Sequence, residues 1–268
     1  MATATRSRTQ AKEDFPEAPA PWSTRCETYW MVTQLPSPLP VDIWDPLEAT
    51  HSTCTVRDFK MGSTGVIMIV RYFDTPVGEY DELAIIPGTF SVTGGPERGQ
   101  NRSRITRIYV NQKEITFNGR RNWNIPKHLA RFEFSSPRTA KGSSPPNELT
   151  VTVYPPEGYK VRAEIPFFKA TFTTMSWTPS FPLSTKYFVN TKFVQPPIPA
   201  GEDTALVGTD SWKSYDVSAW SNRAKLVWVK TEEGRNIVPK GWFPKFKPWS
   251  FGFMLQDATL DISKPEEW

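Results

Sequence analysis

Apolar and polar residues alternate along much of the chain with a period of two, which is the pattern of strands that bury one face. β-Branched and aromatic residues fill these stretches, and turn-forming residues bound them, as is typical of strands joined by tight connections. The predicted strands are 28–35, 65–73, 81–88, 105–112, 128–136, 148–156, 159–168, 224–234 and 249–262. So many strands favour a mainly β fold.

Three segments depart from this alternation. Residues 111–123 predict a helix with Asn111 as the N-cap candidate and an end before Pro126. Residues 209–223 predict a second short helix. Residues 1–20 are small, charged or proline without an apolar period, which is typical of a flexible tail. We expect one domain over residues 21–268, because no repeat and no linker interrupts it.

Composition narrows the architecture. The chain has 268 residues, of which 26 are proline, about twice the usual share of ~5%. Long uninterrupted helices are disfavoured at that density, so short strands with rigid turns fit better. The expectation is an antiparallel β-barrel or cone, closed on itself around an apolar internal pocket, with a few short helices.

Charge and cysteine content exclude several classes of partner. The net charge of +4 is too small to indicate nucleic-acid binding by itself. No run of ~18 apolar residues indicates a membrane span, and the N-terminus has no apolar signal core. We therefore expect a cytoplasmic protein with no membrane partner, in which Cys26 and Cys54 are reduced thiols.

Several catalytic motifs are missing from the sequence. There is no phosphate-binding glycine loop and no Gly-x-Ser-x-Gly elbow, so no cofactor is expected. His51 and Cys54, with Cys26, could supply three zinc ligands. No second ligand pair supports them, so we expect no metal site.

Lys127 stands out because it follows Pro126 within a stretch rich in aromatic and apolar residues. A lysine that enters an apolar interior has its pKa lowered by desolvation. A neutral amine can attack a ketone to give an imine, and a protonated imine accepts the electrons released by loss of CO₂. Glu82, at the start of an apolar strand, would need a partner if buried. The residues alone leave open that Lys127 is an ordinary solvated lysine on a turn.

Three short motifs carry a resemblance to a known family. They are Gly78-Glu79-Tyr80-Asp81-Glu82-Leu83, then Gly119-Arg120-Arg121-Asn122-Trp123-Asn124-Ile125, then Pro126-Lys127-His128-Leu129-Ala130. Their order and type resemble the acetoacetate decarboxylase family, most clearly over residues 65–135. The resemblance implies a β-barrel-like cone with an apolar pocket, a Schiff-base lysine at Lys127 and an active-site glutamate at Glu82. It also implies an arginine near the first strand that pairs with this glutamate, which we match to Arg25.

The resemblance also suggests which residues line the pocket, and it has departures. The candidate substrate-binding residues are Tyr80, Tyr109, Arg120, Trp123 and His128. His128 stands where the family has a second lysine, so a permanent cation beside the nucleophile is missing. Asn124 and Arg121 replace a glycine and a glutamate of the family pattern. These departures leave the fold expectation intact and leave the reaction open.

Two basic stretches have structural explanations that we prefer. Residues 234–253 mix basic side chains such as Arg235 and Lys240 with aromatic ones, which can stack on bases but is more typical of a proline-rich loop covering a barrel end. Residues 96–107 carry four arginines and are expected to form a solvated loop.

Three functions remain open at this stage. The first is a carbon–carbon lyase that acts through a Lys127 imine on a β-keto acid or a polyketide-like carbonyl compound, with Glu82 oriented by Arg25 or Arg120. The second is a non-imine lyase or cyclase of secondary metabolism that uses the same pocket. The third is a non-catalytic carrier of an apolar molecule. A small-molecule carbonyl substrate, no nucleic acid and a homo-oligomer are expected.

Overall fold

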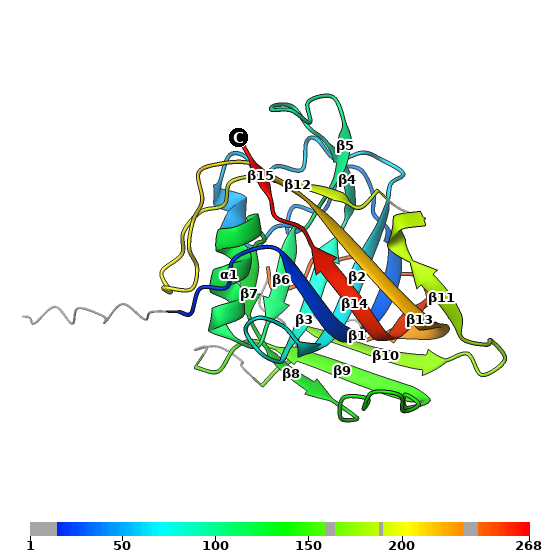
Figure 1. The fold of residues 1–268 in the computed structure, drawn as a ribbon. Coiled ribbons are helices and arrows are strands. Elements are labelled where there is room, and N and C mark those ends of the chain that lie inside the picture. The colour runs from blue at the N-terminus through cyan, green and yellow to red at the C-terminus, as the bar shows by residue number, and fades with distance from the viewer. Residues whose placement is uncertain (1–14, 159–163, 188–189, 233–240) are drawn as a thin grey trace, which may run out of the picture.

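β-Strands dominate the structure, a computed structural model that describes residues 15–158, 164–187, 190–232 and 241–268. Within these residues, fifteen strands form one sheet, accompanied by one α-helix and two 3-10 turns, η1 (Glu48–Thr50) and η2 (Thr185–Tyr187) (Figure 1). The first strands are β1 (Trp22–Gln34), β2 (Thr64–Asp74), β3 (Tyr80–Ile86), β4 (Gly88–Ser91), β5 (Asn101–Arg104), β6 (Arg107–Val110), β7 (Lys127–Leu129) and β8 (Arg131–Phe134). The mainly β expectation is confirmed.

The remaining strands lie in the second half of the chain, where β13 and β14 are the longest. They are β9 (Glu148–Tyr154), β10 (Phe168–Thr174), β11 (Phe181–Ser184), β12 (Lys192–Gln195), β13 (Lys213–Thr231), β14 (Phe251–Ile262) and β15 (Glu266–Glu267). Eight of the nine predicted strands have counterparts among these elements. Most of predicted strand 159–168 lies outside the described residues, and β10 begins only at Phe168.

The sheet is curled but open, so the expected closed barrel is wrong. Its main path runs β4-β5-β12-β13-β14-β1-β2-β3-β6-β7, while β10 joins β13 to β9 and β8 pairs with β9. β7 and β8 follow one another along the chain, with Ala130 between them. β7 pairs with β6 and β8 pairs with β9, so the two strands belong to different parts of the sheet. The sheet therefore forms an open, strongly curled half-barrel (Figure 1).

The predicted helix at 111–123 is confirmed as α1 (Lys113–Trp123). Its N-cap is Gln112, because the side chain of Asn111 instead accepts a hydrogen bond from the backbone of Asp81. Residues 1–14 of the predicted tail lie outside the described part. Residues 15–20 lie against α1, where the backbone N–H of Ala18 donates to the side chain of Asn118.

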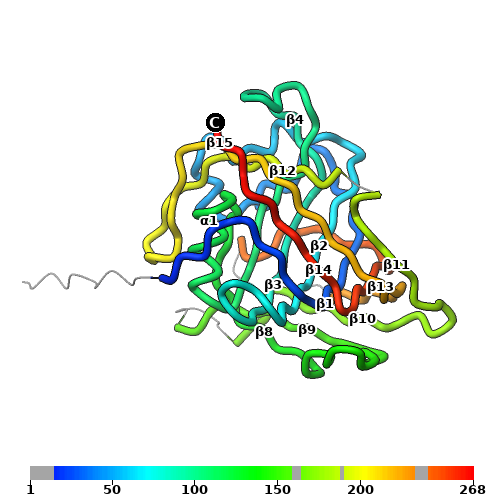
Figure 2. The backbone as a smooth tube through the Cα atoms, in the orientation of Figure 1, coloured from blue at the N-terminus to red at the C-terminus, as the bar shows by residue number. Residues whose placement is uncertain are grey.

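The predicted helix at 209–223 is wrong, because residues from Lys213 onward belong to β13. This strand pairs with β14 over most of its length and also with β10, β11, β12 and β15. Cross-strand pairing with so many neighbours overrides the local preference of a short polar stretch. Figure 2 shows β13 and β14 crossing the molecule side by side.

Both faces of the sheet are buried, and each has its own apolar core. One face carries Val70, Ala84 and Ile108, and α1 packs there through Ile115 and Trp123. The alternate residues of the same strands, among them Ile69, Leu83 and Tyr109, form the second core with β9 and β10. Because successive residues of a strand face opposite sides, neighbouring residues of one strand serve two separate interiors.

Candidate active site

Lys127 owes its position to the way α1 ends. Asn124 caps the helix in the left-handed conformation, with φ of 56°, and its side-chain amide donates to the backbone oxygens of Pro196 and Ser211. The chain then enters β7, where Lys127 pairs with Ile108 of β6. Because these hydrogen bonds fix the turn, the side chain of Lys127 enters the core that contains Ile108. Lys127 is only 4% exposed. The alternative of a solvated lysine is excluded.

The amine of Lys127 reaches a carboxylate on β3. Its Nζ lies 2.7 Å from Oε2 of Glu82, and both side chains are buried. The lysine chain passes directly over Gly119 of α1, where an added Cβ would stand 2.6 Å from Cδ and Cε. A glycine is therefore needed at this helix position to let the lysine through. A buried pair of this kind is stable only while both members are present.

Aromatic and thiol side chains surround the pair. We call Cys26, Tyr72, Tyr80, Trp123 and Tyr215, all members of the same core, the tyrosine cluster. The rings of Tyr72 and Tyr80 stack 4.2 Å apart, and Nζ of Lys127 lies 5.2 Å from the centre of the Tyr80 ring.

The charge of Glu82 acts on the whole cluster. Burial raises the pKa of Tyr72, Tyr80 and Tyr215 well above the usual value, and the negative charge of Glu82 raises each further. The pKa of the Cys26 thiol is raised by the same two causes. These side chains are therefore neutral at ordinary pH and surround a single ion pair.

The arginine expected beside Glu82 is not there. Arg25 and Cys26 are adjacent in β1, so they face opposite sides of the sheet, and it is Cys26 that lies in the tyrosine cluster. Among the described residues, Glu82 forms its ion pair with Lys127 and none with Arg25. The match of Arg25 to the pairing arginine is wrong, and a neutral thiol occupies that side of the pair.

Arg120 does not orient Glu82 either, because it binds a different carboxylate. Its guanidinium Nη1 lies 2.7 Å from Oε1 of Glu48, and its remaining donors reach the backbone oxygens of Lys127, Pro199 and Val207. The segment that contains Pro199 and Val207 runs past α1 (Figure 2). Arg120 thus ties three segments together from a fully buried position.

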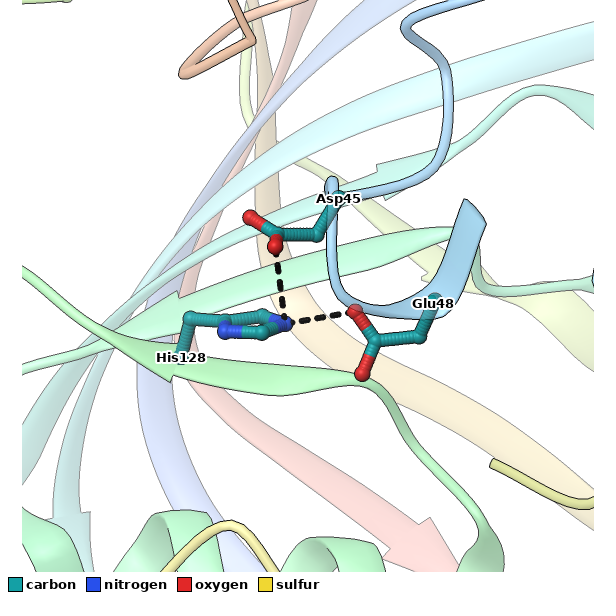
Figure 3. Close-up of side chains that lie close together, drawn as sticks. All are labelled: Asp45, Glu48 and His128. Atoms are coloured by element: carbon teal, nitrogen blue, oxygen red, sulfur yellow. Dashed lines mark hydrogen bonds and ion pairs between the residues drawn. The ribbon is translucent and has the colours of Figure 1, made fainter. Parts of the chain in front are cut away.

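Glu48 in turn binds His128. Its second oxygen, Oε2, lies 2.7 Å from Nε2 of His128, and Oδ1 of Asp45 lies 3.8 Å from the same nitrogen (Figure 3). Burial alone would raise the pKa of Glu48, but the charges and hydrogen bonds of His128 and Arg120 outweigh it and lower the pKa. Glu48 is a fixed carboxylate, and sequence analysis missed it because it lies in an irregular segment without periodicity.

Of the predicted substrate-binding residues, two belong to the core that receives the side chain of Lys127. Tyr80 and Trp123 are in the tyrosine cluster. Tyr109 lies in the second core, where it stacks on Trp242. His128 of β7 pairs with Tyr109 of β6, so its side chain lies on the same side of the sheet. Tyr72 was missed although the β2–β3 hairpin register sets it opposite Tyr80.

One group of described side chains could hold a metal ion. Asp45, Glu48 and His128 offer donor atoms that all lie within 4.8 Å of one another. The zinc set considered from the sequence is not assembled: Cys26 lies in the tyrosine cluster, whereas Cys54 lies in a third core beside Trp44 and Phe59. Neither of these two cysteines forms a disulfide. The pKa of Cys54 is raised to about 12, mainly by burial.

Two of the four arginines in residues 96–107 are fully buried, so the expected solvated loop is wrong for them. Arg107 donates to the backbone oxygens of Asp42 and Gly241 and anchors two loops. Arg104 lies over the rings of Phe90 and Trp212, and burial lowers its pKa to about 10. Neither guanidinium reaches Glu82 among the described contacts.

The described aromatic part of residues 234–253 contributes side chains to the second core, and its covering of a barrel end stays a prediction. Trp242, Phe243 and Phe246 pack against that core. Arg235 and Lys240 lie outside the described residues. No helix in the described part of the chain has both the length and the apolar character needed to cross a membrane.

The site is therefore a buried lysine–glutamate pair inside a curled β half-barrel. Several solved structures are similar to the chain in fold. Acetoacetate decarboxylase from Legionella pneumophila subsp. pneumophila str. Philadelphia 1 aligns with a TM-score of 0.58 and 12% identity, over 99% of this chain and 92% of that one. The enduracididine biosynthesis enzyme MppR, complexed with pyruvate, aligns with a TM-score of 0.56 and 12% identity, over 93% and 91%. An acetoacetate decarboxylase-like enzyme from Sphingomonas wittichii RW1 aligns with a TM-score of 0.53 and 9% identity, over 92% and 91%.

The chain has the acetoacetate decarboxylase-like fold, which confirms the fold implied by the three sequence motifs. No family model matches the sequence, and no curated protein matches it in sequence. The likeness is thus one of structure at low identity, and it shows the fold.

Proposed function

We propose that the protein is an imine-forming enzyme of the acetoacetate decarboxylase type, with Lys127 as the nucleophile. The observation that carries the proposal is the amine of Lys127, buried in an aromatic core 2.7 Å from a carboxylate that can take its proton. Buried lysines with a nearby proton acceptor are suited to imine chemistry. The structural neighbours, which include acetoacetate decarboxylases, support it further.

The pair can handle the protons of imine formation. Lys127 passes one proton to Glu82, and the neutral amine adds to the substrate ketone. The resulting carbinolamine loses water when the Glu82 carboxyl group returns the proton, which leaves a protonated imine. A β-carboxylate then departs as CO₂ and its bonding electrons enter the imine, giving an enamine. The enamine carbon takes up one proton from solvent water, and hydrolysis of the resulting imine releases the ketone and the protonated amine of Lys127.

The charge of the site favours one of the two substrate classes considered. A β-keto acid would bring a second negative charge beside Glu82, and the described contacts of Glu82 include no cation besides Lys127. A buried carboxylate without its own partner is costly. A neutral, polyketide-like carbonyl compound fits better, and the enamine would then serve retro-aldol, dehydration or condensation chemistry rather than loss of CO₂.

Borohydride trapping tests the proposal. The protein is incubated with acetoacetate and, in parallel, with its neutral ethyl ester, then reduced and mapped by peptide mass spectrometry. We expect a reduced adduct on Lys127 with at least one of the two compounds, and more with the ester. Lys213→Met is the matched control, because Lys213 is also buried and bonded to backbone oxygens. A folded wild-type protein without an adduct on Lys127 would refute the imine mechanism.

A second candidate is a non-imine lyase or cyclase of secondary metabolism. A structure of MppR holds the condensation product of pyruvate and imidazole 4-carboxaldehyde, so a neighbour of this fold accommodates a condensation product. Here the Lys127–Glu82 pair would polarise the carbonyl group by hydrogen bonding alone. Turnover of the native substrate would then survive borohydride, which distinguishes this candidate from the first. Homo-oligomer formation and a cytoplasmic location stay predictions.

A further inference from the structure

The hydroxyl group of Tyr215 is a buried polar group without a partner. Tyr215 is 1% exposed, and its hydroxyl group forms no hydrogen bond with any of the described residues. Burying a hydroxyl group unpaired costs free energy, and the large majority of buried polar side-chain atoms in folded proteins have a partner. A molecule bound beside Tyr215 would supply the missing acceptor.

The ring of Tyr215 is held between two aromatic neighbours. In the β12–β13 pairing it lies opposite Phe193, whose ring stacks against it with the centroids 6.1 Å apart. The ring of Trp123 lies 6.4 Å away on α1, and it is fixed in turn because its indole nitrogen donates to the backbone oxygen of Ser263. A ring packed in this way presents its hydroxyl group in one place, so little side-chain freedom is lost when the group binds a ligand.

This hydroxyl group belongs to the surroundings of the Lys127–Glu82 pair. Tyr215 and Tyr80 are members of one core, and Nζ of Lys127 lies 5.2 Å from the centre of the Tyr80 ring. The pKa of Tyr215 is raised first by burial and then by the charge of Glu82, so its hydroxyl group lies within the field of that carboxylate. In the described sheet, β13 pairs with neither β3 nor β7. Tyr215 therefore reaches the pair from a different wall of the core.

The other hydroxyl groups of the tyrosine cluster already have partners. Tyr72 and Tyr80 are hydrogen-bonded to each other through their side chains, and the amine of Lys127 is bonded to Glu82. The hydroxyl group of Tyr215 is neutral, so it keeps its hydrogen and can donate it. A substrate joined to Lys127 would thus meet one hydrogen-bond donor in the cluster that no described residue uses.

Such a donor distinguishes substrates by a second oxygen. The ketone oxygen leaves as water when the imine forms, so a hydrogen bond that lasts beyond this step needs another acceptor on the substrate. A carboxylate at that position would bring a second negative charge beside Glu82, which like charges disfavour. A neutral keto, ether or hydroxyl oxygen accepts the hydrogen bond without that repulsion.

We propose that Tyr215 is a substrate-binding residue, whose hydroxyl group donates a hydrogen bond to a second, neutral oxygen of the carbonyl compound that Lys127 holds as an imine. The substrate class is then a neutral compound with two oxygens, one in the ketone that condenses with Lys127 and the other a few bonds away. The hydrogen stays on Tyr215 throughout, so no further bond is formed or broken. This inference rests on the proposed imine chemistry of Lys127 and names its substrate class.

Two neutral ketones of nearly the same shape test the inference. 4-Methoxy-2-butanone differs from 2-hexanone only in an ether oxygen that replaces a methylene group. Each is incubated with the full-length protein and sodium cyanoborohydride, and the rate of adduct formation on Lys127 is followed by peptide mass spectrometry. We expect the rate ratio, methoxy ketone over 2-hexanone, to be about fivefold higher in the wild type than in Tyr215→Phe, which corresponds to ~1 kcal/mol for one hydrogen bond.

Stability separates substrate binding from a structural role. If the hydroxyl group has no partner in the free protein, Tyr215→Phe should keep or raise the urea midpoint, because it removes an unpaired buried group. Tyr154→Phe is the matched control, since the hydroxyl group of Tyr154 donates to Glu133 at an exposed position. It should leave the rate ratio at the wild-type value.

The failures of the two proposals are distinguishable. Adducts on Lys127 with the same rate ratio in the wild type and in Tyr215→Phe would overturn the role of Tyr215 and leave the imine mechanism standing. A large loss of stability in Tyr215→Phe would also overturn it, because the hydroxyl group would then have a partner in the free protein. A folded wild type without any adduct on Lys127 would refute the proposed function, and this inference with it.

Discussion

Two neighbouring residues of β7 have opposite electrostatic surroundings. Lys127 faces the tyrosine cluster, where Glu82 is its ion-pair partner and the nearby hydroxyl and thiol groups are neutral. His128 faces the other side, where Glu48 is held at the same time by Arg120, and Arg120 by three backbone oxygens. The first arrangement can exchange a proton within the pair. The second has a carboxylate whose charge is fixed by several partners.

The largest expected effect comes from removing the anchor on the His128 side. Arg120→Met should destabilise the protein by about 5 kcal/mol, since it leaves a buried carboxylate with one partner and several buried carbonyl oxygens without donors. Urea unfolding followed by tryptophan fluorescence measures the change. Arg120→Lys should recover less than half of the loss, because one ammonium group cannot replace a guanidinium with four separate partners. A loss below about 1 kcal/mol would show that the network is not stabilising.

The Lys127–Glu82 pair should behave differently when both members are changed. Lys127→Met alone should cost about 3 kcal/mol, because it leaves Glu82 buried without a cation. The double variant Lys127→Met/Glu82→Leu should regain most of that stability, since neither buried charge of the pair is then left. A double-mutant cycle by urea unfolding measures the coupling. Additive losses would mean that the pair is not coupled in the folded protein.

The two sides should also respond to opposite ends of the pH scale. The lowered pKa of Glu48 contributes stability that is present above the ordinary glutamate value of about 4.3 and is lost as pH falls through the folded value. The raised pKa of Tyr72 and Tyr80 contributes stability that is lost as pH rises above about 10, since the unfolded tyrosines ionise first.

Urea midpoints measured from pH 3 to 5 and from pH 9 to 11 check both directions. Glu48→Gln should flatten the acid limb, and Tyr80→Phe should reduce the slope of the alkaline limb. If Glu48→Gln leaves the acid limb unchanged, another carboxyl group is responsible for it.

The smallest effect on stability, with a clear effect on chemistry, is expected at Gly119. Gly119→Ala should favour the helix by up to about 1 kcal/mol, but the new methyl group would overlap Cδ and Cε of Lys127. Displacing the amine from Glu82 should slow imine formation about tenfold. Gly94→Ala, where an added Cβ meets nothing within 4 Å, is the control. An unchanged trapping rate would show that the lysine can move aside without loss.

The sequence predicted the Lys127 side of this comparison better than the His128 side. Alternation over residues 65–88 defines the β2–β3 hairpin that carries Glu82, and Pro126 places Lys127 at the start of a short strand. Tyr215 escaped prediction because its segment has too little local preference, and only its many pairing partners make it a strand. Glu48 lies in an irregular segment. Its role arises from contacts with Arg120 and His128, which lie 72 and 80 positions further along the chain.

The exchange of the expected arginine for Cys26 in the site could not be predicted either. Residues 25 and 26 differ only in which side of β1 they face, and a register change of one residue reverses that assignment. The register between β1 and β2 shifts between these two residues, and it is the packing of Cys26 in the same core as Tyr72 and Tyr80 that assigns its side. The same alternation explains why Tyr109 and His128 belong to a different interior from Lys127.

The most direct test of the central claim is the reaction with 2,4-pentanedione. A neutral amine condenses with this uncharged diketone, loses water and gives a conjugated enaminone with its own ultraviolet absorbance. We expect one equivalent of chromophore, mapped to Lys127, that is retained in Lys213→Met and absent in Lys127→Met. No chromophore in the folded wild-type protein, or a chromophore that persists in Lys127→Met, would contradict it.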